Sequence, residues 1–113
     1  MSNEKQSKTR ISDALLLDFY GQLLTEKAYE ISDLHYNEDM SLAEIAENLC
    51  ISRQAVHDSL KRSARSLRAY EDKLGLAERF LAQSAIAANA LQLMDSGEAK
   101  AARNELLRLI GTI

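Results

Sequence analysis

The side chains of this sequence that could perform chemistry gather in one short segment, residues 53–68. Arginine and glutamine can hydrogen-bond to base edges in a bidentate manner, and arginine and lysine neutralise backbone phosphates. Asp58 is the exception in this segment, because a carboxylate repels phosphate unless it accepts a hydrogen bond from cytosine. The candidate nucleic-acid-binding residues are Arg53, Gln54, His57, Asp58, Lys61, Arg62, Arg65 and Arg68.

The charge distribution supports this interpretation, although the net charge does not. The chain has 14 Lys and Arg against 17 Asp and Glu, which gives a formal net charge of −3. Residues 51–70 nevertheless hold five basic residues and one acidic residue, whereas residues 1–50 hold four basic residues and ten acidic ones. Local positive charge is what attracts a polyanion. The alternative interpretation is a solvated helix face that binds nothing.

Other kinds of functional site find no support in the sequence. His35 and His57 lie far apart, and Cys50 stands in a predicted turn where we expect it to be packed. The spacing of these residues does not match a zinc site. The sequence has no glycine-rich phosphate loop and no arrangement of a nucleophile with a base. We therefore expect a non-enzymatic protein without a metal or another cofactor.

The basic segment belongs to the second helix of a predicted helix-turn-helix. Ser41 and Glu44 have the spacing of a capping box, so a short helix begins at Leu42. Ser52 caps the next helix, and the turn between the two helices is Cys50-Ile51-Ser52. The small residue at the helix crossing is Ala46, and the apolar residues that clamp the crossing are Ile45, Leu49, Ile51, Val56 and Leu60. Met40 with Ile45, and Ile51 with Val56, are spaced as hydrophobic staples.

The rest of the chain predicts more helices, and an all-α fold follows because the sequence contains no proline and is rich in helix formers. We expect a disordered N-terminus over residues 1–11 and a helix-turn-helix domain over residues 12–75. Within that domain an N-terminal helical pair spans residues 12–24 and 26–36. The apolar face of its first helix holds Leu15, Leu16, Phe19, Tyr20 and Leu23. The helix after Ser52 buries a seam of Val56, Leu60, Ser63, Leu67, Tyr70 and Leu74 and ends at Gly75.

Residues 76–113 are predicted to form a C-terminal helical appendage, with helices over 77–94 and 99–110. Both helices have wide apolar faces, which could pack on the first two helices or on a second copy of the chain. Helix-turn-helix proteins often act as two-fold dimers, so we expect a homodimer. Its possible contact residues are Phe80, Leu81, Leu106 and Ile110.

The compartment is predicted to be the cytoplasm. No apolar run approaches the roughly 20 residues that span a bilayer. The polar N-terminus lacks the apolar stretch of a secretory signal. The single cysteine cannot form an internal disulfide, which is compatible with a reducing compartment.

The segment SLAEIAENLCISRQAVHDSLKR, residues 41–62, resembles region 4 of bacterial sigma factors. The longer run over residues 15–74 is similar to the YlxM-like family of small bacterial helix-turn-helix proteins. Its most specific pieces are DFYG at 18–21, LLTEK at 23–27 and ISRQAV at 51–56. Members of that family are typically encoded beside the GTPase of the signal recognition particle. The resemblance therefore implies a regulatory role in that protein-targeting pathway, with components of the particle as partners.

Two other functions remain open from the sequence. One is a DNA-binding transcription regulator, and the other is a protein-interaction adaptor whose helix-turn-helix binds no nucleic acid. Net acidity and Asp58 favour the adaptor, whereas the basic segment favours nucleic acid. The sequence does not decide between DNA and RNA, and it identifies neither the recognised sequence nor the protein partner. It also leaves open whether the C-terminal helices dimerise or pack within the chain.

Overall fold

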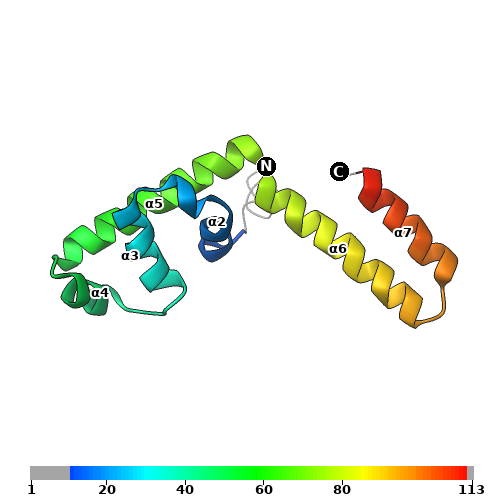
Figure 1. Cartoon of the computed structure of the whole chain (residues 1–113), viewed down its shortest axis with the longest axis horizontal. Helices are drawn as coiled ribbons and strands as arrows, with labels where there is room; N and C mark the ends of the chain where they lie inside the picture. The colour runs from blue at the N-terminus through cyan, green and yellow to red at the C-terminus, as the bar shows by residue number, and fades with distance from the viewer. Residues whose placement is uncertain (1–10, 112–113) are drawn as a thin grey trace, which may run out of the picture. The chain divides into compact units, whose positions relative to one another are not determined.

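The computed structural model describes residues 11–111, and in this range all regular secondary structure is helical (Figure 1). The all-α fold class is thereby confirmed. The elements in chain order are α2 (Asp13–Tyr20), η1 (Gly21–Leu23), α3 (Glu26–Tyr36), α4 (Leu42–Leu49), α5 (Arg53–Leu74), α6 (Leu76–Asp95) and α7 (Ala99–Gly111). They form two compact units, residues 1–75 and residues 76–113. The predicted disordered segment, residues 1–11, lies outside the described residues except for Ile11, which is buried.

The first helix is shorter than the predicted range of residues 12–24. Ser12 caps α2 by accepting from the Leu15 N–H, and the α-helix ends at Tyr20, after which η1 continues as a 3₁₀ turn. Its buried side chains are Leu16, Leu17 and Tyr20. The prediction was therefore wrong for Leu23, which is 56% exposed, and it missed Leu17.

Helices α3, α4 and α5 surround the core of the first unit. This core consists of Ile31, Ile45, Ala46, Val56 and Leu60, and the partly buried Leu34, Tyr36, Met40, Leu42, Leu49 and Ile51 pack against it. The two predicted staple pairs therefore share one apolar cluster. Thr25 caps α3 through the Ala28 N–H, so this helix has the predicted bounds.

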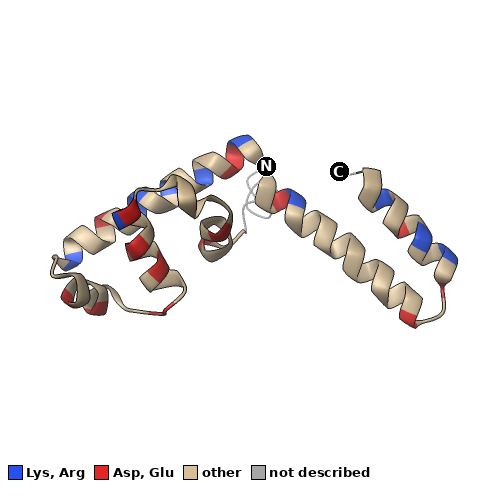
Figure 2. Cartoon of the chain, in the orientation of Figure 1, with Lys and Arg blue, Asp and Glu red and all other residues tan. Residues whose placement is uncertain are grey.

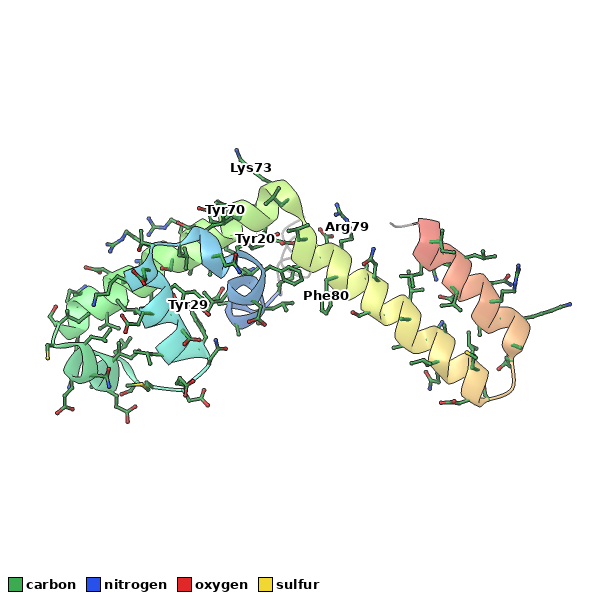
Figure 3. The ribbon with its side chains drawn as sticks, in the orientation of Figure 1. Tyr20, Tyr29, Tyr70, Lys73, Arg79 and Phe80 are labelled. Carbon is green, nitrogen blue, oxygen red and sulfur yellow. The ribbon has the colours of Figure 1, made fainter. Side chains whose placement is uncertain are left out.

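The long helix α5 forms the spine of the first unit and contacts α2, α3 and α4 (Figure 1). Its buried side chains are Val56, Ser59, Leu60, Ser63 and Leu67. The predicted seam is wrong at its end, since Leu74 is 49% exposed. Tyr70 packs beside Tyr20 of α2, with ring centroids 6.0 Å apart (Figure 3). Gly75 ends the helix in the left-handed conformation, with φ 63°.

The second unit is a hairpin of α6 and α7 (Figure 1). The turn between the helices contains Gly97, whose φ is 83°. Small residues allow the two helices to approach closely, since Ala90 and Ala102 are each 2% exposed. Much of the remaining apolar surface is exposed, including Phe80, Leu81, Leu91, Met94, Leu106, Leu107 and Ile110.

Candidate nucleic-acid interface

The turn between α4 and α5 sets the angle at which α5 leaves the core. Ser41 accepts from the Glu44 N–H at 3.1 Å and Glu44 accepts from the Ser41 N–H at 2.8 Å, so the predicted capping box is confirmed. Cys50 then adopts the left-handed conformation, with φ 58° and ψ 44°. The Ile51 N–H donates to the Ala46 carbonyl at 3.0 Å and closes the turn. Cys50 itself is exposed, so the expectation that it is packed was wrong.

Most of the predicted contact residues lie on the exposed side of α5. The side chains of Arg53, Gln54, His57, Lys61, Arg62 and Arg65 are all exposed, away from the seam that starts at Val56. Basic residues recur along α5, whereas α3 and α4 carry mainly acidic ones (Figure 2). Helix α5 thus presents a positive, solvent-accessible surface while its other side holds the core together.

Asp58 is the centre of a small polar network on this surface. The Gln54 Nε2 donates to the Asp58 Oδ1 at 2.9 Å, and the His57 Nδ1 lies 3.5 Å from the same oxygen. The hydrogen bond from Gln54 lowers the pKa of the Asp58 carboxyl, and His57 lowers it further. The carboxylate is therefore ionised and partly shielded by its neighbours. This bond uses one N–H of the Gln54 amide, so the second N–H and the Oε1 can still contact a base.

Arg68 occupies a different place from the other predicted contact residues. Its Nη2 donates to the Ile11 carbonyl at 2.7 Å and to the Asp13 Oδ1 at 3.0 Å. The Tyr36 hydroxyl donates to the other Asp13 oxygen at 3.3 Å, so one carboxylate joins α2, α3 and α5. Burial raises the pKa of Tyr36, and Asp13 raises it further. Arg68 therefore stabilises the fold, which corrects its expected placement with the solvent-facing cations.

Lys27 was not identified in the sequence as a candidate, yet it lies near one of the predicted residues. It lines a groove together with Arg62, one of the exposed basic residues of α5. Lys27 belongs to α3, and no sequence spacing relates it to a residue so far along the chain. In the sequence, Lys27 stands out only as part of the LLTEK piece, which indicates family resemblance and not a binding role.

Across residues 11–111, His, Cys, Asp and Glu side chains form no group of three or more that could hold a metal ion. None of the helices in the same range has the length and apolar character needed to cross a membrane.

The fold and the exposed basic surface define the chain as a helix-turn-helix protein. Comparison with known families agrees, because residues 6–108 match the model of the UPF0122 family, whose members are YlxM / p13 like. The chain belongs to the UPF0122 family. The resemblance to YlxM-like proteins seen in the sequence is thereby confirmed over most of the chain.

Curated relatives place the similarity in a group of bacterial proteins. A UPF0122 protein of Acetivibrio thermocellus is 60% identical over 70 residues, which cover 62% of this chain and 60% of that protein. A UPF0122 protein of Desulforamulus reducens is 49% identical over 88 residues, or 75% of each chain. One from Clostridium kluyveri is 58% identical over 69 residues, covering 61% of this chain and 62% of the relative. The match thus spans less than two thirds of the Acetivibrio and Clostridium proteins.

Proposed function

We propose that this protein is a non-enzymatic regulator in the signal recognition particle pathway and that α5 contacts nucleic acid. The observation that carries the nucleic-acid part is the exposed basic surface of α5, formed by Arg53, Lys61, Arg62 and Arg65. The helix-turn-helix family supports the same reading. The pathway is supported by family resemblance alone, since YlxM-like proteins are typically encoded beside the GTPase of the particle. Components of the particle are the expected protein partners, in the cytoplasm.

The test is a fluorescence anisotropy titration against DNA duplexes and structured RNAs at several salt concentrations. Three to four phosphate contacts imply a log–log salt slope of roughly −3 to −4 on duplex DNA. The double variant Lys61→Ala/Arg65→Ala should make that slope shallower by about two units. The same double change at Lys100 and Arg103, which are exposed on α7 in the second unit, is the matched control and should leave the slope unchanged. Absence of binding to either nucleic acid at low salt would contradict the proposal.

The preference of the protein for DNA or for RNA distinguishes the pathway proposal from the alternative of a DNA-binding transcription regulator. A regulator that acts on its own would prefer one DNA sequence over random duplexes of equal length. In that case Gln54→Ala should relax the sequence preference and leave the salt slope nearly unchanged, because an amide neutralises no phosphate. A preference for structured RNA over every duplex would instead favour the targeting pathway.

A protein-interaction adaptor is the second candidate, and the acidic surface of α4 favours it. Glu44 and Glu47 are exposed on the helix that precedes the turn, where they would repel a phosphate backbone close to α4. In this case the basic surface of α5 would dock an acidic protein. Purification of the protein from its native cell, with and without nuclease, distinguishes the two. Partners that remain after nuclease treatment support the adaptor.

A further inference from the structure

A groove of about 410 Å³ runs between the start of α3 and the middle of α5. Its polar lining comes from Thr25 and Lys27 on one side and from Ser59, Arg62, Ser63, Ser66 and Tyr70 on the other, and Leu23, Leu24 and Ala28 complete the lining. Two of these residues are cations, and the lining contains no Asp or Glu. All of the lining belongs to the first compact unit. The groove is therefore a positively charged recess with several hydroxyl groups.

Two of these hydroxyl groups belong to serines that are largely buried, and neither bonds to another group of the described chain. Ser63 is 3% exposed and Ser59 is 8% exposed, and among the described residues neither side chain makes a hydrogen bond. A buried serine in a helix commonly donates to a carbonyl one turn earlier. Among the described residues, the hydroxyl that is fully buried without a partner is that of Ser32, which does not line this groove. The Ser59 and Ser63 hydroxyls are therefore open to the groove and available to a ligand.

The start of α3 adds to the positive character of the groove. Helix α3 has 11 residues, and its first N–H groups have no acceptor within the helix. The Thr25 hydroxyl oxygen accepts a hydrogen bond from the Ala28 N–H. The N–H groups that precede Ala28 in the first turn have no acceptor within the helix and are available to a ligand. Glu26 lines the neighbouring recesses instead of this groove. Lys27 lies 3.9 Å from Glu30, but both side chains are more than half exposed, so this pair holds Lys27 only weakly.

We propose that this groove binds a phosphate group. Two cations, several hydroxyl donors and a helix N-terminus suit an oxyanion with several acceptor oxygens. Arg62 lines the groove and also belongs to the exposed basic surface of α5. The arrangement therefore favours, as the source of the phosphate group, one backbone phosphate of the nucleic acid that α5 contacts. This choice of source rests on the proposed function. The phosphate of a free nucleotide has the same chemistry and is the other source.

The first test uses inorganic phosphate and the whole protein. Amide resonances of Lys27 and Ser63 should shift saturably in an NMR titration, with sodium chloride of equal ionic strength as the reference. Ser63→Ala should weaken phosphate binding about three- to tenfold, the worth of one hydrogen bond. It should not lower the melting temperature, since the hydroxyl makes no bond within the described chain. Ser84→Ala, at an exposed position of α6, is the control. Absence of saturable shifts, or unchanged affinity in Ser63→Ala, overturns the proposal.

The second test identifies the source of the phosphate. Lys27→Gln should reduce the salt slope of nucleic-acid binding by about one unit, whereas Lys100→Gln should leave it unchanged. If the wild type binds nucleic acid and Lys27→Gln keeps the full slope, the backbone source is wrong and the proposed function stands. If phosphate binds but no nucleic acid does, the proposed function fails and the groove belongs to a free phosphate-bearing molecule.

Discussion

Cys50 is the residue at which the helix-turn-helix departs from ordinary turn chemistry. Its φ of 58° lies in the left-handed region, where glycine is usual and a side chain is strained. The left-handed conformation costs a residue with a side chain about 1–2 kcal/mol. Glycine avoids this strain, but it lowers the free energy of unfolding by about 0.5–1 kcal/mol because it gives the unfolded chain more entropy. The difference leaves a small net gain for glycine at this position.

Cys50→Gly should therefore raise the free energy of unfolding by up to about 1 kcal/mol in urea denaturation. Cys50→Ala is the matched control, because it removes the thiol and keeps the strain. An equal gain in both variants would show that the thiol, and not the backbone, is the source of the instability.

Two serine caps define the starts of the two helices of the helix-turn-helix, α4 and α5. Ser41 and Ser52 each accept a backbone N–H, at 3.1 Å and 3.0 Å. Replacement of either by alanine should lower the free energy of unfolding by about 0.5–2 kcal/mol. The Ser41 change should have the larger effect, because loss of its hydroxyl also loosens the reciprocal capping-box bond from the Ser41 N–H to Glu44. Thermal melts of both variants check this, and wild-type stability in both would contradict the importance of the caps.

Tyr36 makes the stability of the first unit sensitive to alkaline pH. Burial raises the pKa of its hydroxyl from the usual 10.0, so the folded state holds the proton more tightly than the unfolded state does. The stabilisation is complete below the unfolded pKa and is lost as the pH rises through the folded pKa. Tyr36→Phe should therefore lose less stability than the wild type as the pH rises above about 10.

Denaturation curves at several alkaline pH values measure this difference. Tyr29→Phe is the matched control, since it removes the hydroxyl of a tyrosine that is 40% exposed. A decline in Tyr36→Phe as steep as that of the wild type would contradict the assignment.

At the scale of elements, local signals predicted the helices well. The bounds of α3 agree with the prediction because Thr25 at one end and the polar loop after Tyr36 at the other are local features. The capping box and the Ser52 cap likewise placed the starts of α4 and α5. Gly75 has the left-handed conformation expected of a helix terminator. Each of these features depends on residues within one helical turn of the boundary.

The errors arose where a distant residue determines the local structure. Helix α2 ends at Tyr20, and Gly21 follows where the ring of Tyr29 from α3 comes close. Arg68 faces Asp13, 55 positions earlier in the chain, and therefore does not join the solvent-facing cations. The groove between α3 and α5 was missed for the same reason. Periodicity identifies the buried side of a helix, but it does not reveal which helix covers that side.

The approach of Tyr29 to Gly21 can be tested directly. A Cβ at Gly21 would lie 2.8 Å from the Tyr29 Cε1 and 3.1 Å from the Leu17 Cδ1. Gly21→Ala should destabilise the protein by about 1–3 kcal/mol through overpacking. The effect should shrink in a Tyr29→Ala background, because the close contact is then gone. Gly111→Ala is the control, since a Cβ there meets nothing within 4 Å. Equal losses in both backgrounds would rule out the Tyr29 contact.

At the scale of the whole molecule, the candidate nucleic-acid interface and much of the exposed apolar surface belong to different parts of the chain. The candidate nucleic-acid interface and the groove lie in the first unit, whereas the second unit exposes many large apolar side chains. Phe80 is 47% exposed and Ile110 is 64% exposed. A hairpin that leaves this much apolar surface in water favours association with another surface. A second copy of the chain would pair two helix-turn-helix units on one nucleic acid.

Leu106 provides the test of this homodimer. It is 41% exposed on α7, so the change Leu106→Glu places a charge on the surface and leaves the buried contacts of Ala90 and Ala102 intact. Light scattering should show a dimer for the wild type and a monomer for Leu106→Glu, with an unchanged helical circular dichroism spectrum. Arg103→Glu, at another exposed position of the same helix, is the control and should remain dimeric. A wild-type monomer at high micromolar concentration would exclude the homodimer. Unfolding of Leu106→Glu would assign Leu106 to the core within the chain, because a surface position tolerates the charge.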